Sequence, residues 1–479
     1  MTTSYDNFIG GAWTAGVDQR RNINPSDTSD VIGLYASASG EQADDAIRSA
    51  RDAFAGWSRG GIQARHDSLQ FVANELMKRR EEIGDLLARE EGKTRPEGIG
   101  ETMRAAQIFD FFAGEVIRQR GEKIPSVRPG IGVEITREPL GVVAAITPWN
   151  FPIAIPAWKI APALAFGNCV VFKPADLAPG CAWTLAEIIS RSGIPEGVFN
   201  LVMGPGSRIG QVVLDHPEID AVTFTGSITV GGRVAASCAA RRAKFQLEMG
   251  GKNPLVVLGD ADLENAVECA VNGAYYSTGQ RCTASSRLVV TEDIHDRFVE
   301  RMIERLESLV VDDARKKGTQ MGPAVDASQL NQDLEYIEIG RQEGARLACG
   351  GDRLKRDTEG FYLAPALFTE TTRDMRINRE EIFGPVASVI RVRDYDEALA
   401  VANDTEFGLS AGICTMSLKY ATDFKRNSEA GMVMVNLPTA GVDYHVPFGG
   451  RKGSSYGPRE QGSYAAEFYT TVKTAYELA

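Results

Sequence analysis

A cysteine and a glutamate in the middle of the chain have surroundings that suit covalent catalysis. Cys282 lies in Gly-Gln-Arg-Cys-Thr (279–283), shortly after a glycine and between polar neighbours. Glu248 ends an apolar run in Leu-Glu-Met-Gly-Gly (247–251), and the two glycines after it allow a ligand or backbone to approach closely. Burial raises the pKa of a carboxyl group, which suits a base that works near neutral pH. The pair therefore indicates a thiol that forms a thioester and a carboxylate that helps to hydrolyse it.

Both residues also have ordinary structural explanations. A lone cysteine is usually a small buried hydrophobic residue, which is our interpretation of the other six. A buried glutamate is often held by a structural partner. The polar neighbours of Cys282 set it apart, and Arg281 beside it is expected to favour the thiolate.

A third candidate is Asn150, which lies between two prolines in Pro-Trp-Asn-Phe-Pro (148–152). The prolines fix the backbone around it. An amide held in a dry pocket can donate to an oxyanion, and one such donor contributes about 2.7–4 kcal/mol to a transition state. A plain turn asparagine is the alternative explanation.

The segments around these residues predict a parallel sheet. Short apolar runs alternate with helical segments between residues 142 and 225, which is typical of βαβ units buried on both faces. A second α/β region is expected over 254–436, a hairpin at 123–138, and an alternating strand from 468 that pairs with another element or subunit. The strands predicted first are 142–146, 169–172, 198–203 and 221–225, and the helices are 43–57, 66–89, 101–119, 160–166, 182–190 and 209–215.

Two turns after predicted strands suit a dinucleotide. Gly226 and Ser227 open a helix, where backbone N–H groups and the helix dipole can face a pyrophosphate. The spacing is looser than G-x-G-x-x-G, and a plain strand–turn–helix explains it equally well. Lys173 and Asp176 can reach ribose hydroxyls, although a solvated turn is the alternative. A carboxylate there repels a 2′-phosphate and favours NAD, but aspartate is shorter than glutamate, so this exclusion is expected to be incomplete.

Composition limits the class of protein and of partner. A chain of 479 residues suits two or three domains, and its net charge of −12 argues against a nucleic-acid surface. Seven scattered cysteines and four histidines without ligand spacing predict neither disulfides nor a metal site. We expect a cytoplasmic protein without a signal peptide. Prolines and Lys159 interrupt the most apolar region, residues 142–172, so no membrane span is expected.

Taken together, the ordered motifs resemble those of the aldehyde dehydrogenase superfamily over nearly the whole chain. The matching segments are Pro-Trp-Asn-Phe-Pro (148–152), Lys-Pro-Ala-Asp (173–176), Phe-Thr-Gly-Ser (224–227), Leu-Glu-Met-Gly-Gly-Lys-Asn-Pro (247–254), Gly-Gln-Arg-Cys (279–282), Glu-Ile-Phe-Gly-Pro (381–385) and Pro-Phe-Gly-Gly (447–450). The resemblance implies NAD(P)-dependent oxidation of an aldehyde to a carboxylic acid through a cysteine thioester.

The resemblance also implies an α/β fold in three parts. These are a Rossmann-type cofactor domain (1–123 and 141–248), an α/β catalytic domain (249–440) and a small β oligomerisation arm (124–140 and 453–479). Such an arm implies a homodimer or homotetramer.

Roles for individual residues follow from the same resemblance. Cys282 would be the nucleophile and Glu248 the general base. Asn150 would form the oxyanion hole with the Cys282 N–H, and Glu460 matches a second carboxylate implicated in proton relay.

Lys173 would bind the adenine ribose, and Glu381 the nicotinamide ribose. The residues expected to contact NAD or NADP are Ile146, Thr147, Pro148, Trp149, Lys173, Asp176, Gly206, Phe224, Gly226, Ser227, Val230, Met249, Gly250, Glu381 and Phe383. Those expected to contact the substrate are Arg281, Phe151 and Phe448.

Three segments, 178–183, 281–287 and 440–460, are most similar to α-ketoglutaric semialdehyde (2,5-dioxopentanoate) dehydrogenases of bacterial sugar-acid catabolism. The distal carboxylate of such a substrate could meet Arg281, or Arg451 and Lys452, which are equally well explained as structural or surface charges. Succinate or glutarate semialdehyde and a broad range of aldehydes remain alternative substrates. A CoA-acylating or esterase-like reaction is a further alternative, although Glu248 disfavours the CoA route because a positioned base promotes hydrolysis. The furthest alternative is a catalytically silent binding protein on the same fold.

Overall fold

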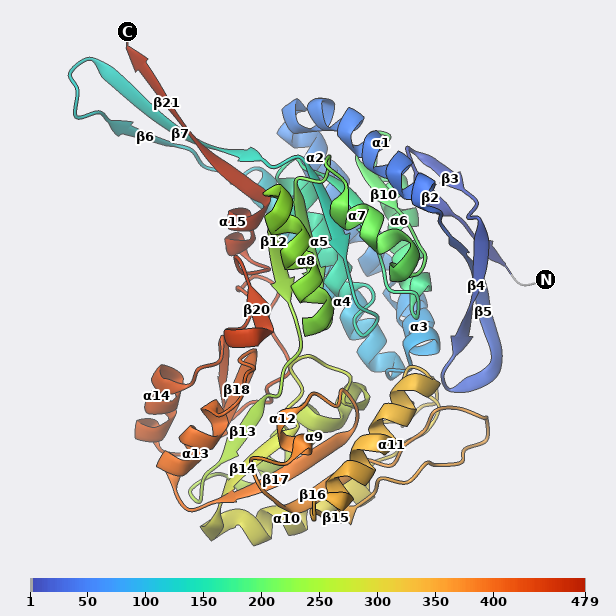
Figure 1. The fold of residues 1–479 in the computed structure, drawn as a ribbon, viewed down its shortest axis with the longest axis vertical. Helices are drawn as coiled ribbons and strands as arrows, with labels where there is room; N and C mark the ends of the chain where they lie inside the picture. Colours follow the sequence, from blue (N-terminus) through green and yellow to red (C-terminus); the bar gives the residue numbers. More distant parts are fainter. Residues whose placement is uncertain (1–2, 479) are drawn as a thin grey trace.

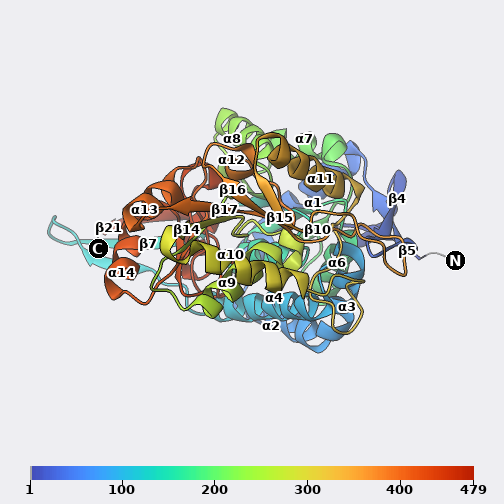
Figure 2. The same ribbon diagram turned by 90° about the horizontal axis from the view of Figure 1, so that it is seen from below.

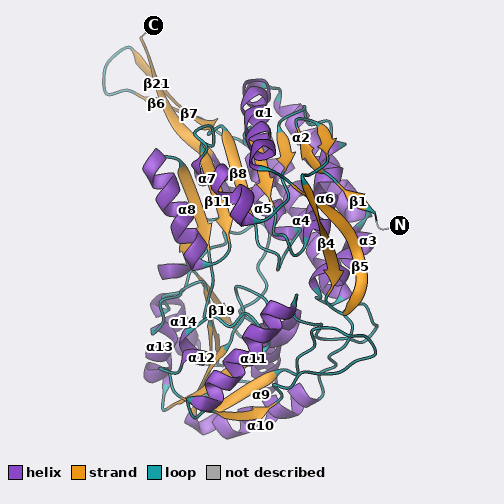
Figure 3. Cartoon of the chain, turned by 45° about the vertical axis from the view of Figure 1, so that its right-hand side comes forward, coloured by secondary structure: helices purple, strands orange, loops and turns teal. Residues whose placement is uncertain are grey.

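The structure is a computed structural model that describes residues 3–478. Two large sheets, each flanked by helices, lie one above the other, and a long β-ribbon projects from the upper part (Figure 1). Figure 3 shows the same division, with strands between helices in both parts. The fold therefore has the mixed α/β character that the alternating sequence pattern predicts.

The upper sheet has eight strands in the order β20-β12-β11-β8-β9-β10-β2-β3. Strands β8 to β12 run parallel, and β20, β2 and β3 add antiparallel edges. The strands are β2 (Asn7–Ile9), β3 (Ala12–Thr14), β8 (Val142–Ile146), β9 (Cys169–Lys173), β10 (Phe199–Leu201), β11 (Ala221–Thr225), β12 (Lys244–Glu248) and β20 (Ser455–Tyr456).

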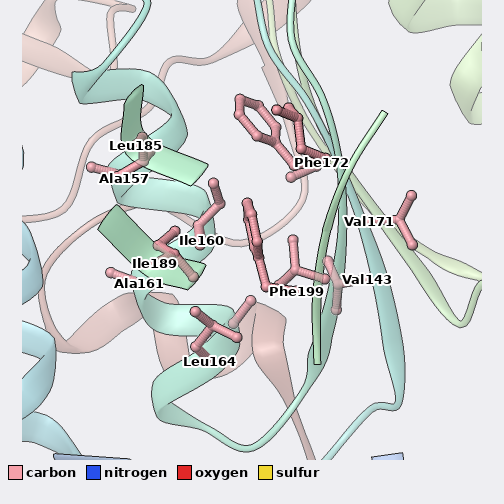
Figure 4. Packing of buried hydrophobic residues seen from close by; sticks show 14 of the residues in the cluster. Val143, Ala157, Ile160, Ala161, Leu164, Val171, Phe172, Leu185, Ile189 and Phe199 are labelled. Carbon is pink, nitrogen blue, oxygen red and sulfur yellow. The ribbon is translucent and has the colours of Figure 1, made fainter. Parts of the chain in front are cut away.

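Helices cover this sheet and bury its apolar side chains. Figure 4 shows Ile160 and Leu164 of one helix near Phe172 and Phe199, whose side chains belong to the same buried cluster. The helical segments of this part are α1 (Gly40–Arg59), α2 (Ile62–Lys78), α3 (Arg80–Glu91), α4 (Arg95–Val116), α5 (Ala154–Ala165), α6 (Pro179–Ser190), η1 (Gly206–Gly210), α7 (Gln211–Asp215) and α8 (Ile228–Arg241). The apolar runs predicted to be strands are therefore buried on both faces, as parallel strands require.

The lower sheet has seven strands in the order β15-β16-β17-β14-β13-β18-β19. Along β13, Leu255 and Val257 pack with α9 and α10, whereas Val256 packs with α13, because alternate side chains of a strand point to opposite faces. Figure 2 shows α9 and α10 on one side of this sheet and α11 and α12 on the other. The elements are β13 (Pro254–Val257), β14 (Arg287–Thr291), β15 (Arg346–Cys349), β16 (Ala366–Thr371), β17 (Val386–Val392), β18 (Ser410–Cys414), β19 (Met432–Val435), α9 (Leu263–Tyr275), η2 (Tyr276–Gly279), α10 (Glu292–Glu307), α11 (Ala327–Gln342), α12 (Arg376–Arg379), α13 (Tyr395–Asn403) and α14 (Leu418–Asn427).

The projecting ribbon joins a hairpin to the C-terminal strand. Strands β6 (Glu122–Pro125) and β7 (Ile131–Pro139) form the hairpin, and β21 (Thr470–Leu478) pairs antiparallel with β7 along its whole length. The predicted hairpin and the predicted pairing of the terminal strand are both confirmed. The remaining elements are η3 (Lys452–Ser454), η4 (Ser463–Ala465) and α15 (Ala466–Tyr469).

Two features of the N-terminal third differ from the sequence prediction. The single helix predicted over 66–89 is two helices, because Arg79 leaves the helical conformation and bonds Glu82 and Glu187 with its guanidinium. No glycine or proline marks that break. The sequence also did not reveal the small sheet β1-β5-β4, which consists of β1 (Ser4–Tyr5), β4 (Asp18–Asn24) and β5 (Asp27–Ser37).

No helix among residues 3–478 is both long and apolar enough to cross a bilayer.

Candidate active site

The C-terminal ends of four parallel strands bring predicted site residues side by side. In the register of the upper sheet, Ile146 at the end of β8 is paired with Lys173 of β9 and with Phe224 of β11. Glu248 ends β12 and is paired with Thr225. Residues that are about 100 positions apart in the chain therefore share one sheet edge, where open α/β sheets bind their ligands.

The turn that carries Cys282 has an unusual backbone. Ser277 and Thr278 have φ of 51° and 58°, and Gly279 has φ of 67°. Such values are uncommon for non-glycine residues and persist only where the surroundings hold them. A Cβ on Gly279 would lie 2.3 Å from the carbonyl oxygen of Gly384, so only glycine fits there.

Glu97, in the first turn of α4, holds this turn in place. One of its carboxylate oxygens accepts hydrogen bonds from the Ser277 N–H and hydroxyl, both at 2.9 Å, and from the Arg281 guanidinium at 3.0 Å. The other oxygen accepts from Thr94 and so caps the same helix. Sequence reasoning missed Glu97, although its capping position three residues after a threonine was visible.

The Cys282 thiol is held in its protonated form. Burial raises its pKa to about 12, and the nearby carboxylates of Glu381 and Glu248 act in the same direction. The backbone N–H groups of Cys282 and Thr283 favour the thiolate, but less strongly. Arg281, which was expected to favour the thiolate, pairs with Glu97 through its guanidinium.

Asn150 lies beside this thiol and is nearly inaccessible to solvent. Its side-chain N–H₂ donates to the carbonyl oxygen of Gln280 at 3.0 Å, which leaves its second hydrogen for another acceptor. The backbone carbonyl of Asn150 accepts from the buried ammonium of Lys93 at 2.7 Å, and Lys93 also binds Glu101 at 2.8 Å. Gln280 therefore holds the side-chain amide of Asn150, and Lys93 holds its backbone.

The two remaining catalytic candidates, Glu248 and Glu460, are both buried carboxyls. Ser455 donates to Glu248 at 2.5 Å, and Lys159 and Thr223 donate to Glu460. Burial raises the pKa of Glu248 well above its usual range, and the charge of Glu460 adds to that effect. Burial also raises the pKa of Glu460, while Lys159 opposes the shift.

Lys159 was missed as a site residue. It is fully buried in the otherwise apolar helix α5. A lone charge among apolar residues was the available signal.

Two cavities meet at Cys282. The larger has a volume of about 370 Å³ and is lined by the predicted substrate contacts Phe151, Arg281 and Phe448, and by Lys93, Glu97, Glu101, Arg104, Trp158 and Gln461 among others. The smaller has a volume of about 200 Å³ and is lined by Pro148, Trp149, Asn150, Ile155, Thr225, Gly226, Ser227, Met249, Gly250, Cys282, Gln329, Glu381 and Phe383. The thiol can thus be reached from two sides.

The larger cavity contains an arginine that sequence reasoning missed. Arg104 of α4 donates to the carbonyl of Val442 and forms no ion pair with the described residues. Burial lowers the pKa of Arg104, and the charge of Asp443 acts in the opposite direction. Arg451 and Lys452 do not line this cavity, and Lys452 pairs with Glu429 instead.

The other predicted cofactor residues do not line the smaller cavity. Thr147 directly follows β8, Val230 lies exposed in the first turn of α8, and Gly206 begins η1. Asp176 lies in the loop after β9 and binds Arg20. Ile146, Lys173 and Phe224 occupy the strand ends described above.

The smaller cavity suits a dinucleotide. The α8 N-terminus opens on it, with Ser227 as its capping residue, and such an end attracts phosphate. Glu381 is half-buried on its wall, where desolvation raises its pKa to about 7 and the Gly251 N–H donates to its carboxylate at 2.8 Å. A Cβ on Gly250 would lie 2.2 Å from the Glu381 carboxylate, so this glycine keeps the space open. Trp149 and Phe383 pack edge to face with their centroids 5.5 Å apart.

Residues 13–475 match the model of the aldehyde dehydrogenase family. The chain is 44% identical over 478 residues to an alpha-ketoglutaric semialdehyde dehydrogenase of Bacillus subtilis, covering 99% of this chain and 98% of the relative. It is 42% identical over the full length of both chains to an alpha-ketoglutarate semialdehyde dehydrogenase of Haloferax volcanii. Its fold matches the crystal structure of betaine aldehyde dehydrogenase from Staphylococcus aureus in complex with NAD⁺, with a TM-score of 0.97 at 34% identity, over 99% of this chain and 95% of that one.

Proposed function

Since this chain belongs to the aldehyde dehydrogenase family, we propose that it oxidises α-ketoglutaric semialdehyde to 2-oxoglutarate with NAD(P). The observation that carries this proposal is the position of Cys282 where a cavity with an unpaired arginine meets one suited to a dinucleotide. The names of the two relatives point to the same substrate.

The first step is attack by the Cys282 sulfur on the aldehyde carbon. The thiol proton must leave, because burial keeps its pKa near 12, and Glu248 is the buried carboxylate that can accept it. The carbonyl oxygen becomes an alkoxide, which the free hydrogen of the Asn150 amide and the Cys282 N–H stabilise. The bond formed is C–S, and the π electrons of the carbonyl move to oxygen.

A bound nicotinamide dinucleotide would supply the hydride acceptor. Hydride then leaves the carbon attached to Cys282, an electron pair of the alkoxide oxygen re-forms the C=O bond, and a thioester remains. Glu248 first releases the thiol proton toward solvent, and as a carboxylate it then takes a proton from water as the water attacks this thioester. The C–S bond breaks, the acid product leaves and the thiol regains a proton. Ser455 orients Glu248 through its 2.5 Å hydrogen bond, and Glu460 with Lys159 continues the buried chain of groups that can carry the proton.

The dinucleotide would lie along the sheet edge and the smaller cavity. We assign the pyrophosphate to Gly226 and Ser227, the adenine ribose to Lys173, and the nicotinamide ribose to Glu381. The remaining contacts would come from Ile146, Thr147, Pro148, Trp149, Asp176, Gly206, Phe224, Val230, Met249, Gly250 and Phe383.

The larger cavity favours an aldehyde with a negative charge at its far end. Its charged lining residues are three cations and two carboxylates, and Glu97 and Glu101 pair with Arg281 and Lys93. Arg104 is left to bind a substrate carboxylate, a charge-assisted contact that suits arginine. Phe151 and Phe448 would contact the carbon chain between the carboxylate and the aldehyde.

We further propose that the chain works as a homodimer or homotetramer in the cytoplasm. The ribbon of β6, β7 and β21 presents apolar side chains to solvent, including Val472, Tyr476 and Leu478, and such faces are usually covered by a partner. We also propose that residues 1–123 and 141–248 form a cofactor domain, residues 249–440 a catalytic domain, and residues 124–140 and 453–479 an oligomerisation arm.

The test is an aldehyde panel read by the absorbance of reduced cofactor, with NAD and NADP in parallel. We expect the highest kcat/KM with α-ketoglutaric semialdehyde, and lower values with succinate semialdehyde, glutarate semialdehyde and neutral aldehydes. Cys282→Ala should lower the rate by about a thousandfold or more. Cys349→Ala removes another partly accessible thiol and should leave the rate unchanged.

Each alternative has its own outcome. Preference for a shorter or neutral aldehyde would reject the substrate but keep the mechanism. Turnover by Cys282→Ala would reject the mechanism, and a wild-type protein that reduces no cofactor with any aldehyde would be a binding protein on this fold.

A further inference from the structure

An ion pair at the predicted ribose site joins two distant parts of the chain. The Arg20 guanidinium, on β4, donates to the Asp176 carboxylate at 2.5 Å across 156 positions of sequence. Arg20 is half exposed, with 53% of its side chain accessible, whereas Asp176 retains 21%. The arginine therefore binds the carboxylate and keeps part of its own surface open to solvent.

This pair lies next to the lysine assigned to the adenine ribose. Lys173 ends β9 and Asp176 follows it by three residues. Burial lowers the pKa of Lys173, Asp176 opposes this effect, and Arg20 adds to it, so both charges act on the lysine ammonium. Arg20, Asp176 and Gly204 also line a small hollow beside the loop that leads to Gly206.

The charges of these three side chains decide what the ribose site accepts. A free carboxylate beside the ribose favours a 2′-hydroxyl and repels a 2′-phosphate. Here the positive charge of Arg20 balances the negative charge of Asp176 in their ion pair. The ammonium of Lys173 therefore gives the three side chains together a net positive charge. Aspartate also ends one methylene earlier than glutamate, which leaves room beside the ribose.

We propose that Arg20 and Lys173 form a subsite for the 2′-phosphate of NADP, with Asp176 held aside by Arg20. The subsite rests on the cofactor placement proposed above. A guanidinium offers several donors in one plane to phosphate oxygens, which suits it to this ligand. In this arrangement the chain binds NADP as well as NAD, and Arg20 determines the balance between them.

The test measures binding without turnover. Isothermal titration calorimetry of the full chain with 5′-AMP and with 2′,5′-ADP compares two ligands that differ only by the 2′-phosphate. We expect Arg20→Gln to lower the ratio of the 2′,5′-ADP to the 5′-AMP association constant by about tenfold or more, which corresponds to one charge-assisted contact. Raising the salt concentration should reduce this ratio in the wild type more than in the variant.

A matched control separates the site from a general loss of positive charge. Arg48→Gln removes another exposed arginine that pairs with an aspartate, Asp44, at 2.8 Å on α1, and should leave the ratio unchanged. Thermal unfolding by circular dichroism verifies that each variant is folded.

The outcomes distinguish this subsite from the proposed function. Binding of 5′-AMP without 2′,5′-ADP in the wild type would overturn the subsite and leave the cofactor placement standing. Equal losses for both ligands in Arg20→Gln would show that Arg20 only positions the loop, which also overturns it. Binding of neither ligand would reject the cofactor placement and the subsite together.

Discussion

Single residues in this site owe their protonation mainly to burial. The thiol of Cys282 and the carboxyls of Glu248 and Glu460 all have pKa values above their usual ranges, and burial is the largest cause for each. Two carboxyls that share a buried region cannot both ionise easily. Glu248 acts as a base only when it is ionised. Because its pKa is raised, the ionised fraction of Glu248 changes with pH above the range in which carboxyl groups usually titrate.

The Glu248–Glu460 pair leads to a prediction about pH. The charge of Glu460 helps to raise the pKa of Glu248, so Glu460→Gln should lower that pKa. Because the ionised base would then persist to lower pH, the acid limb of the kcat profile should move to lower pH. The measurement is kcat across pH 5–10 for both proteins.

A suitable control for this profile is Glu477→Gln, which removes an exposed carboxylate of β21. It should leave the acid limb in place. A limb that moves to higher pH in Glu460→Gln would contradict the electrostatic coupling described here.

Arg104 gives a prediction about substrate choice. Arg104→Gln should lower kcat/KM for α-ketoglutaric semialdehyde relative to a neutral aldehyde by roughly 10- to 100-fold, mainly through KM, since a charged hydrogen bond contributes about 1.5–3 kcal/mol. Arg118→Gln, an exposed arginine just after the same helix, serves as the control. An unchanged ratio would show that the distal carboxylate binds elsewhere.

At the scale of elements, α4 connects helix capping with the geometry of the nucleophile. Its N-terminal carboxylate, Glu97, both caps the helix and holds the turn before Cys282, whose residues Ser277 and Thr278 have strained backbones. The turn cannot hold this conformation by local preference. Its geometry therefore depends on a helix that lies about 180 positions earlier in the chain.

Two variants of this capping interaction separate its roles. Glu97→Ala removes the cap and the contacts to Ser277 and Arg281, whereas Thr94→Ala removes only the threonine side of the cap. Both should lower the free energy of unfolding by about 1 kcal/mol. Only Glu97→Ala should lower kcat, by about 10- to 100-fold, because the thiol loses its position.

Denaturant melts and steady-state kinetics on both variants make this measurement. Equal kcat losses in the two would mean that helix stability alone supports the turn.

At the scale of the whole molecule, the projecting ribbon is the part that a single chain leaves incomplete. Three apolar side chains of β21 share one face, because even numbers of positions separate them along the strand: Val472, Tyr476 and Leu478. Their side chains are 56%, 63% and 75% exposed. A strand with such a face is expected to be covered in the assembled protein.

Charges on this face should weaken the assembly. Val472→Asp combined with Tyr476→Asp should convert the protein to smaller species in sedimentation velocity, because each carboxylate would be buried without a partner. Met416→Asp alters an equally exposed apolar residue outside the ribbon and should leave the sedimentation coefficient unchanged. A monomeric wild-type protein would reject the proposed role of the ribbon.

The sequence by itself determined the strand and helix pattern and the chemically special residues. Apolar runs and glycines act locally, so strands such as β8 and β11 and the turn at Gly226 were predictable from neighbouring residues. The ordered motifs also identified the family that the comparison with known proteins confirms. The roles assigned to Cys282, Glu248 and Asn150 remain predictions. Cys282 and Asn150 line the smaller cavity, and Glu248 ends β12 directly before Met249 and Gly250, which line it.

Only the tertiary structure decided which side chains these residues meet. Lys159 pairs with Glu460, Glu97 with Arg281, and Arg20 with Asp176, each across more than 150 positions or between separate elements. Arg104 became a candidate only because the structure shows its cavity and no carboxylate partner for it among residues 3–478. Burial, pairing and pKa depend on distances between segments that packing brings together, and no local pattern in the chain encodes those distances.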